Sequence, residues 1–467
     1  NPEQLHVYLL DFGTNGLLPL VDLPHVADTM MVDEVEKIQK FLRICASEIK
    51  TRKQMLSQYR VANLEQYEKA SGKMLPNIII VLDNYDAVKD AGLGDEFEKT
   101  VTQITREGAS IGLFMILSAS RHMSLRTHMA TNIKQMIALY LIDKNDVSST
   151  VGRTDTPLEE YPGRALVKLE TVTSFQTVLP SQGEETIQQI EGIRNEAKLM
   201  SIGWQGEIPN KVPMIPEKIS LADFYEWQET KEIIADGKIP IGVDFEYVKP
   251  LAIDYKQTGV LIIADTAGRN LVSINKNIAT SLTQNPNISL LISETSNLDL
   301  AEMAGKVKLY SNNADDLRQN MKKAISIYQS RVEKADELRK SGDSLEVATM
   351  IKGLKDIVIF IGEFDILLKA LNEDEQKALI EMITNGKMYG CYIILSGAVQ
   401  TFKGYSDLNK AIQAQRNYVY FDRLSNSSPF SFSFNHYKEQ ELLPEEGYVI
   451  SGQEWQKIKI AKYEEEV

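Results

Sequence analysis

The sequence predicts an α/β protein built from two related modules, each a largely parallel sheet covered by helices. Apolar runs of strand length alternate with helical patterns, which indicates a doubly wound sheet. One apolar run, residues 77–82, stops abruptly at Asp83, as strands of such sheets do at a ligand-binding crevice. Residues 356–365 (DIVIFIGEFD) then repeat residues 77–86 (NIIIVLDNYD), so the architecture is duplicated.

The repeat covers four strand-like runs in the same order, about 280 residues apart. The paired runs are residues 6–12 with 288–294, residues 77–86 with 356–365, residues 112–120 with 390–398, and residues 161–167 with 444–450, which align Gly163 with Gly447. Four runs in one order with nearly constant spacing predict that the second module is an imperfect copy of the first.

Periodicity predicts the elements of the first module. Five consecutive apolar residues, 78–82, predict a strand buried on both faces. Apolar residues that recur every three or four positions predict a helix over residues 33–60. In chain order the expected elements are a strand at 5–12, that helix, the strand at 77–82, a helix at 97–107, strands at 113–117 and 137–142, a hairpin at 165–169 and 174–179, and a helix at 184–201.

A change of composition predicts the boundary between the modules. Three prolines between residues 204 and 219 break both helix and sheet. We therefore expect a partial first module at 1–203, a linker at 204–219 and a second module at 220–467. The second module is expected to begin with a short helix capped by Ser220 and a β-rich stretch at 239–255.

Composition narrows the class of protein. The 467 residues include 51 basic and 65 acidic ones, a formal net charge of −14, which argues against binding duplex DNA or a membrane surface as the main role. Two cysteines, Cys45 and Cys391, predict a reducing compartment rather than a disulfide framework. The five histidines lack metal-ligand spacing, and no apolar run approaches the about 18 residues that cross a membrane.

Two terminal features and one aromatic stretch complete the expectations. The chain begins at Asn1 without a methionine, so we expect it to be a fragment. Residues 430–434 (FSFSF) alternate like a strand with an aromatic face, which favours a core position over a substrate groove. Residues 464–466 are acidic and are expected to be disordered.

Asp83 is a candidate magnesium ligand. In P-loop NTPases a carboxylate at the end of such a strand, the Walker B position, holds Mg²⁺ on the nucleotide phosphates. The alternative is that Asp83 only caps a following helix.

The stretch from residue 260 to residue 279 has the layout of a phosphate-binding loop, a strand running through a small-residue turn into a helix. Against the motif GxxxxGK[ST], Ala264 takes the first glycine, Arg269 the second, Asn270 the lysine and Leu271 the hydroxyl residue. The candidate loop therefore comprises Ala264, Asp265, Thr266, Ala267, Gly268, Arg269, Asn270 and Leu271. Asn270 carries no charge for the phosphates and Leu271 cannot bind Mg²⁺, so we expect a degenerate loop.

The second Walker B position is degenerate as well. Gly362 stands where Asp83 stands in the first module, and only Glu363 remains beside it. Weak or absent hydrolysis is therefore expected in the second module. The alternative is that residues 260–279 form a plain strand–turn–helix corner. By the same repeat, the phosphate loop of the first module would lie just before residue 1, so that module is expected to be truncated at its N-terminus.

The ordered set of motifs resembles the FtsK/SpoIIIE class of hexameric motor ATPases, and among them the coupling ATPases of type VIIb secretion in Gram-positive bacteria. The phrases that carry the resemblance are NIIIVLDNYD, ITREGASIGLFMILSASR, IALYLID, YPGRALVKL, IPNKVPMIP and IPIGVDFEYVKPLAIDY. Together they span most of the chain. The resemblance implies two tandem RecA-like modules of the P-loop NTPase fold, with ATP and Mg²⁺ as cofactors.

The resemblance also implies partners and a place in the cell. It implies a hexameric, membrane-anchored parent at the cytoplasmic face of the bacterial membrane, of which this part is soluble. It further implies contact with other type VII membrane components and with small helical WXG100-type effectors. The acidic net charge leads us to expect no nucleic acid partner. In related proteins the last module recognises the C-terminal signal of a substrate.

Site residues follow from the resemblance where motifs match. Asp83 matches the Mg²⁺ aspartate, and Asn84 stands where the family often has a catalytic glutamate, which puts hydrolysis in doubt. Ser120 stands at the polar sensor position. Arg106 and Arg121 are candidates for phosphate or neighbour contacts, and the alternative for both is a surface salt bridge.

Three functions are consistent with the sequence. The first is a secretion motor whose last module is a pseudo-ATPase that recognises substrate and regulates the modules before it. The second is a DNA translocase of the same class, which the acidic net charge disfavours because a DNA pump needs a basic pore. The third is a structural scaffold with vestigial nucleotide sites.

Overall fold

The computed structural model describes residues 1–121, 124–340, 344–430, 432, 439 and 441–464. The chain divides into two compact units, residues 1–213 and 214–467, and the division falls inside the proline-rich stretch. Within the described ranges, no helix combines the length and the apolar character that crossing a membrane requires.

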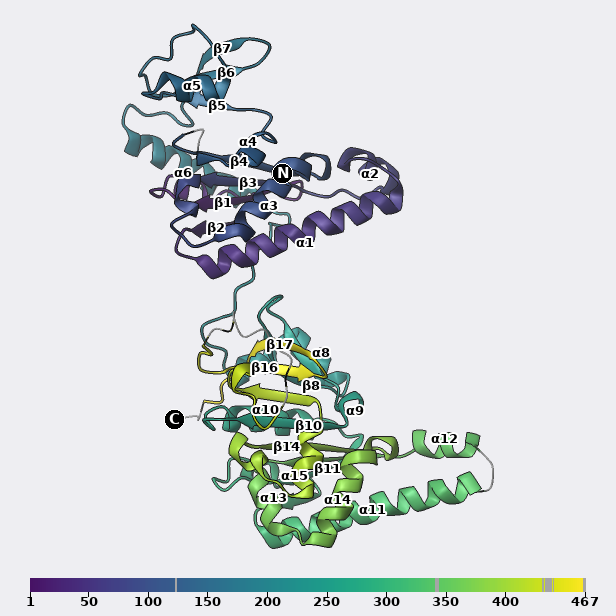
Figure 1. Ribbon diagram of the computed structural model, residues 1–467. Helices are drawn as coiled ribbons and strands as arrows, with labels where there is room; N and C mark the ends of the chain where they lie inside the picture. The colour runs from purple at the N-terminus through teal and green to yellow at the C-terminus, as the bar shows by residue number, and fades with distance from the viewer. Residues whose placement is uncertain (122–123, 341–343, 431, 433–438, 440, 465–467) are drawn as a thin grey trace. The chain divides into compact units, whose positions relative to one another are not determined.

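A parallel sheet organises unit 1. Its four strands lie in the order β2-β1-β3-β4 and are all parallel. Their bounds are β1 (Leu5–Asp11), β2 (Val26–Met31), β3 (Asn77–Asp83) and β4 (Leu113–Leu117). The long helix α1 (Val35–Tyr59) and α3 (Gly94–Glu107) pack their apolar sides against one face of this sheet (Figure 1).

The remaining elements of unit 1 are short, with one exception near its end. They are η1 (Leu18–Leu20), α2 (Leu64–Ser71), η2 (Tyr85–Val88), η3 (Gly108–Ile111), α4 (Thr127–Ala130), α5 (Lys144–Val151) and the longer α6 (Thr186–Gly203).

The second face of this sheet is partly open, which contradicts the expectation of a strand buried on both faces. Ile80 and Leu82 of β3 are buried on the α1 side, whereas Ile79 and Val81 are only half-buried. On β4 the exposed fraction of Ile116 reaches 59%. Five apolar residues in a row therefore predicted the strand correctly but not the cover on its second face.

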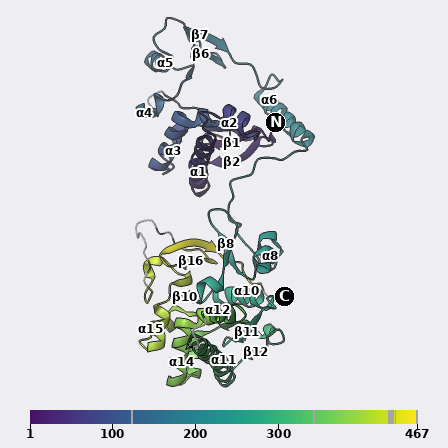
Figure 2. The same cartoon turned by 90° about the vertical axis from the view of Figure 1, so that its right-hand side faces the viewer.

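A separate antiparallel sheet lies within unit 1, apart from the parallel one (Figure 2). It consists of β5 (Ile137–Leu139), β6 (Arg164–Lys168) and β7 (Val172–Gln176), with α5 packed on one side. The predicted strand at 137–142 is shorter than expected. Leu139 is paired with Ala165, and β6 begins at Arg164, so β5 has almost no partner left beyond Leu139.

One ten-stranded sheet organises unit 2, in the order β12-β11-β13-β14-β10-β15-β16-β17-β8-β9. The first six strands are parallel and the last four extend the sheet in antiparallel fashion. The strands are β8 (Ile239–Asp244), β9 (Pro250–Ile253), β10 (Val260–Asp265), β11 (Ile288–Ser293), β12 (Leu309–Ser311), β13 (Asp356–Ile361), β14 (Cys391–Ala398), β15 (Asn417–Phe421), β16 (Glu446–Ser451) and β17 (Glu454–Lys459).

Helices cover both faces of the parallel half of this sheet. Helix α10 packs on one face, and α11, α13, α14 and α15 pack on the other. The helices are α7 (Leu221–Glu226), α8 (Gln228–Ala235), α9 (Tyr255–Thr258), α10 (Leu271–Thr283), η5 (Ala301–Met303), α11 (Ala314–Lys340), α12 (Ser344–Lys352), α13 (Phe364–Ala370), α14 (Glu373–Asn385), η6 (Gly386–Tyr389), η7 (Val399–Lys403), α15 (Asp407–Gln413) and η8 (Leu424–Asn426). As predicted, Ser220 caps α7, because its Oγ accepts a hydrogen bond from the backbone N–H of Asp223.

The strand order confirms the internal repeat. The order β2-β1-β3-β4 in unit 1 matches β12-β11-β13-β14 in unit 2. The register corrects one pairing by a single residue: Leu5, rather than His6, corresponds to Ile288, because each lies opposite the first residue of the next strand, Asn77 or Asp356. In unit 2, β14 also pairs with β10, whereas within the described residues β4 pairs only with β3.

The aromatic stretch at 430–434 lies only partly within the described residues. Phe430 is buried in the core of unit 2 and packs with Phe432 against Tyr418 and Tyr420, which agrees with the expected core position. Residues 431, 433 and 434 lie outside the described residues, as do residues 465–466 of the acidic end.

Candidate functional site

Two aspartates meet where β1 and β3 end in unit 1. Asp11 and Asp83 are partners in the strand register. Asp11 is almost completely buried, and its carboxylate accepts hydrogen bonds from the backbone N–H groups of Gly13 at 3.3 Å and Leu17 at 2.9 Å. The carboxylate of Asp11 therefore holds the loop after β1 close to the end of β3.

Asp83 keeps one carboxylate oxygen turned toward that loop. Its Oδ1 accepts a hydrogen bond from Ser118 Oγ at 2.6 Å. A Cβ atom placed on Gly13 would lie 2.6 Å from Asp83 Oδ2, so the loop approaches this closely only because residue 13 is glycine. Asn84, not Asp83, precedes the next helical turn, η2, which has no side-chain cap. The alternative interpretation of Asp83 as a helix cap is therefore wrong.

Asn84 is held by its neighbours in a left-handed backbone conformation with φ of 61°. Its side-chain Nδ2 donates to the carbonyl of Phe12 at 3.0 Å, and its backbone N–H donates to Ser118 Oγ at 2.9 Å. A carboxamide has no basic oxygen comparable to a carboxylate. Asn84 thus stands beside Asp83 as a structural link to β1.

Ser120 and Arg121 follow β4 at the same edge of the sheet. The backbone N–H of Ser120 donates to Asp86 Oδ2 at 2.7 Å, and the hydroxyl of Ser124 donates to the other oxygen of Asp86. Burial raises the pKa of Asp86, but these hydrogen bonds outweigh it and leave the pKa below its ordinary value. The side chains of Ser120 and Arg121 are exposed.

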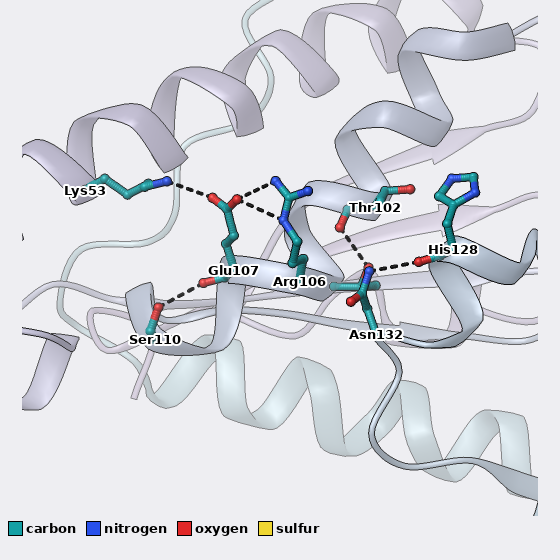
Figure 3. A network of polar contacts seen from close by, with 8 residues as sticks. Lys53, Thr102, Arg106, Glu107, Ser110, His128 and Asn132 are labelled. Atoms are coloured by element: carbon teal, nitrogen blue, oxygen red, sulfur yellow. Dashed lines mark hydrogen bonds and ion pairs between the residues drawn. The ribbon is translucent and has the colours of Figure 1, made fainter.

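Arg106 lies elsewhere in unit 1 (Figure 3). It is in the last turn of α3, and its Nε donates to Glu107 Oε1 at 3.0 Å, while Lys53 bonds to the same carboxylate at 2.8 Å. Helix α3 leads through η3 to the amino end of β4, whereas Asp83 is at the carboxyl end of β3. The structure therefore does not bring Arg106 to Asp83, and it gives Arg106 the surface ion pair that was its alternative.

The degenerate loop of unit 2 joins β10 to α10. Ala264 is fully buried in the strand, Gly268 has a φ of 72°, and Arg269 is exposed. Asp265, the last residue of β10, accepts hydrogen bonds from the backbone N–H groups of Ala267 at 2.9 Å and Asn270 at 2.8 Å.

A second carboxylate borders this loop. Asp422 Oδ2 accepts a hydrogen bond from Thr266 Oγ1 at 2.6 Å, and Asp422 directly follows β15, which pairs with β10. Leu271 begins α10, and its side chain packs against the core. The two carboxylates make this edge acidic, in contrast to a loop that binds phosphate.

Buried polar atoms without partners mark the second Walker B position. Asn275 donates to the carbonyl of Gly362 at 2.9 Å, but its own Oδ1 has no partner. The Oγ of Ser396, fully buried on β14, has none either. Glu363 bonds to neither of these two atoms. Its Oε2 instead accepts a hydrogen bond from the backbone N–H of Ser296 at 2.9 Å.

The two units differ in how well they suit Mg²⁺ and a nucleotide. Magnesium in such sites takes one or two carboxylates and completes its shell with water and phosphate oxygens. Asp83 with Ser118 fits this pattern in unit 1. In unit 2 Gly362 offers no carboxylate, and Asp265 occupies the loop's own donors, so the residues do not fit. Within the described residues, no cluster of three or more histidine, cysteine, aspartate or glutamate side chains could hold a metal by itself.

The sequence did not single out two arginines that bond at the amino ends of the strands leading to Asp83 and Gly362. Arg52, buried on α1, donates to the carbonyls of Ile111 and Pro76, each at 2.8 Å. Arg331 on α11 makes the same bonds in unit 2, to the carbonyls of Tyr389 and Lys355, each at 2.6 Å. The two arginines occupy equivalent positions in the repeat, and this could have revealed them.

Unit 2 also contains a cavity of about 670 Å³. It lies between α8, α9 and the turn from α10 to β11, at the amino ends of β10 and β11. The lining includes Tyr225, Ile234, Tyr255, Asn285, Pro286 and Ile288. The cavity is therefore at the opposite edge of the sheet from the degenerate loop.

Comparisons with known proteins identify relatives of this chain. Residues 1–160 match the FtsK/SpoIIIE family. The chain is 32% identical over 464 residues to the type VII secretion system protein EssC of Staphylococcus aureus (strain NCTC 8325 / PS 47), covering 98% of this chain and 30% of that protein. The chain thus spans about a third of the length of the curated relatives it matches.

Solved structures give the same result. EssC (ATPases 2 and 3) from Geobacillus thermodenitrificans matches with a TM-score of 0.85 and 30% identity, covering 99% of this chain and 86% of that one. EccC (ATPases 2 and 3) of Thermomonospora curvata, solved in complex with a signal sequence peptide, shares the fold with a TM-score of 0.61 at 18% identity, covering 100% of this chain and 83% of that one.

Both tandem units have the predicted α/β fold, and Gly362, which follows β13, corresponds in the repeat to Asp83 at the end of β3. Sequence identity and structural similarity cover nearly the whole chain. The chain therefore belongs to the EssC proteins of the FtsK/SpoIIIE family.

Proposed function

We propose that this chain forms two adjacent ATPase-type modules of a motor that couples nucleotide to protein export through a type VII secretion system. The observation that carries the proposal is the asymmetry between the two units. Unit 1 keeps the Asp83–Ser118 pair at 2.6 Å, whereas unit 2 has Gly362 and an unpartnered Ser396 at the same positions.

Unit 1 is the module that would engage Mg²⁺ and ATP. Asp83 would bind the metal through the oxygen that faces Gly13, and Ser118 would fix the orientation of the carboxylate. In unit 2 the strand that leads into the phosphate-type loop, β10, pairs with β14. The corresponding strand of unit 1 would pair with the available edge of β4. Asn84, which lacks a basic oxygen, supports slow hydrolysis rather than fast turnover.

Unit 2 would serve as a regulatory and recognition platform that neither binds nor hydrolyses nucleotide. It lacks the lysine, the hydroxyl and the metal carboxylate that phosphoryl transfer requires. Its cavity of about 670 Å³ is of the size that ligand sites in proteins have. Docking of a partner there would act on the other module through a difference in affinity between two states.

The partners that we propose are WXG100-type effectors and their C-terminal signals, further copies of the chain in a hexamer, and membrane components of the same secretion system. A signal sequence peptide bound to the Thermomonospora relative supports the first of these. The place of action would be the cytoplasmic face of the membrane. The formal net charge of −14 speaks against DNA as cargo.

Peptide binding tests this proposal. A fluorescent peptide with the last 25 or so residues of a WXG100-type protein should bind the chain, measured by anisotropy. A scrambled peptide of equal charge is the control, and labelled duplex DNA at low salt tests the alternative function of a DNA translocase. Binding of the DNA but not of the peptide would favour a DNA translocase. Binding of neither would favour a structural scaffold with vestigial nucleotide sites.

A further inference from the structure

The phosphate-type loop of unit 2 contains a negative group of its own. We propose that the carboxylate of Asp265 acts as an internal anion that closes the loop at 265–270 to phosphate, independently of the missing lysine. This inference rests on the proposed function, in which unit 2 does not bind nucleotide. It adds a named residue that enforces this state.

The geometry places Asp265 on the donors that a phosphate would use. In phosphate-binding loops the backbone N–H groups before and at the start of the helix point at the phosphate oxygens. Here the N–H of Asn270, at the position of the motif's lysine, donates to Asp265 Oδ2 at 2.8 Å, and the N–H of Ala267 donates to Oδ1 at 2.9 Å. Asp265 is only 1% exposed, so it is fixed in this position.

A second carboxylate reinforces the closure. Asp422 follows β15, and its Oδ2 receives hydrogen bonds from Thr266 Oγ1 and Asn426 Nδ2, both at 2.6 Å. Thr266 is thereby turned toward Asp422. A phosphate that entered the loop would meet two negative charges at short range, and such repulsion is strong near a protein surface.

The missing lysine and the carboxylate of Asp265 are separable causes of a loop that does not bind phosphate. If only the lysine and the hydroxyl were lacking, Asn270→Lys with Leu271→Ser would restore binding. If Asp265 closes the loop, those two changes are insufficient, because the N–H groups stay occupied and the carboxylate also pairs with the new lysine.

The test is a set of four proteins with the full chain: wild type, Asn270→Lys/Leu271→Ser, Asp265→Ala, and the triple variant. Calorimetry with pyrophosphate and with Mg²⁺-ATP measures binding, in an Asp83→Ala background so that unit 1 does not contribute. We expect the triple variant to bind at least about tenfold more tightly than the wild type or the double variant.

Matched variants separate closure from folding. Asp254 caps α9 in a similar way, through the N–H groups of Lys256 at 2.9 Å and Gln257 at 3.4 Å, so Asp254→Ala in the double variant should not create binding. Asp265→Asn keeps one acceptor oxygen without the charge and should give intermediate affinity. Thermal unfolding identifies any variant that has lost its structure.

Each outcome decides the question. Equal affinity of the double and triple variants would overturn the inference. So would a folded triple variant that binds no anion, or a folded Asp265→Asn variant in the same background that binds none. Tight Mg²⁺-ATP binding by the Asp83→Ala chain with all other residues native would instead contradict the proposed function of unit 2.

Discussion

The hydroxyl of Ser118 donates a hydrogen bond of 2.6 Å to the carboxylate of Asp83. The same hydroxyl accepts the backbone N–H of Asn84 at 2.9 Å, so one side chain joins the ends of β3 and β4. At the equivalent place in unit 2 the serine remains as Ser396, but Gly362 supplies no carboxylate and the hydroxyl is buried without a partner. Unit 2 therefore contains the equivalent serine without a carboxylate for it to bond.

The two serines should respond in opposite directions to the same substitution. Ser396→Ala removes a buried hydroxyl that has no hydrogen bond, so the free energy of unfolding should rise by about 1 kcal/mol. Ser118→Ala breaks two hydrogen bonds at an exposed position and should lower it by about 1 kcal/mol. Urea unfolding gives the size of each change, and hydrogen exchange in β4 and β14 assigns it to a unit. A loss of stability for Ser396→Ala would mean that the hydroxyl has a partner, such as a buried water.

Gly362→Asp should fail to rebuild the metal site. A Cβ atom at residue 362 would lie 2.9 Å from the carbonyl oxygen of Ser293, so β11 must move to admit any side chain. We expect the free energy of unfolding to fall by about 1–3 kcal/mol, without binding of Mg²⁺-ATP by calorimetry. Gly305→Asp is the control, because no atom lies within 4 Å of the added Cβ. A stable Gly362→Asp chain that gains metal binding would contradict this expectation.

Periodicity and repetition in the sequence were sufficient to predict the parallel strands and their duplication. Both depend on local patterns that a single chain displays directly, namely apolar runs and the turn residues that end them. The comparison of residues 6–12 with 288–294 was wrong by one position, because apolar residues are interchangeable along a buried strand. Only pairing with β3 and β13 fixed that register.

Contacts distant in sequence could not be predicted in the same way. The sequence could single out Asp83 and residues 264–271 as candidates, since strand ends are local features. It could not show that Arg106 lies at the amino edge of the sheet, which depends on the path from α3 into β4. Nor could it show that Asp265 folds back on Asn270, because an aspartate at a strand end is compatible with many hydrogen-bond partners.

Glu107 should make unit 1 sensitive to acid. The hydrogen bond from Lys53, then that from Arg106, holds the pKa of Glu107 below its ordinary value. A lowered pKa means that the stabilisation is present above the ordinary glutamate pKa of about 4.3 and is lost as the pH falls through the lower value in the folded protein. Glu107→Gln should therefore cost up to about 1 kcal/mol at pH 7, and this difference should shrink as the pH falls below the ordinary glutamate pKa of about 4.3.

Chemical unfolding of the wild type and of Glu107→Gln at several pH values measures this difference. Glu191→Gln, at an exposed position of α6, is the control and should change little at any pH. A constant difference between Glu107→Gln and the wild type from pH 7 to pH 3 would show that the charge of Glu107 is not the cause.

Arg52 and Arg331 should each stabilise their own unit, and Arg52 should do so more strongly. Arg52 is 2% exposed, and Arg52→Met would leave the carbonyls of Ile111 and Pro76 without their donor in a place that water reaches poorly. The free energy of unfolding should fall by about 2–4 kcal/mol. Arg331→Met removes the equivalent bonds in unit 2, but Arg331 is only half-buried, so water can replace part of what is lost and the cost should be about 1–2 kcal/mol.

Lys334→Met provides the matched control, because Lys334 is on the same helix as Arg331 and its side chain is exposed to solvent. Its cost should be below about 0.5 kcal/mol. Hydrogen exchange should show faster opening at the amino ends of β3 and β4 for Arg52→Met, and of β13 and β14 for Arg331→Met, because each arginine bonds to the residues that precede those strands. Equal and small costs for all three variants would mean that helix packing alone holds these corners, and that the repeated arginines are not what fixes the strands carrying Asp83 and Gly362.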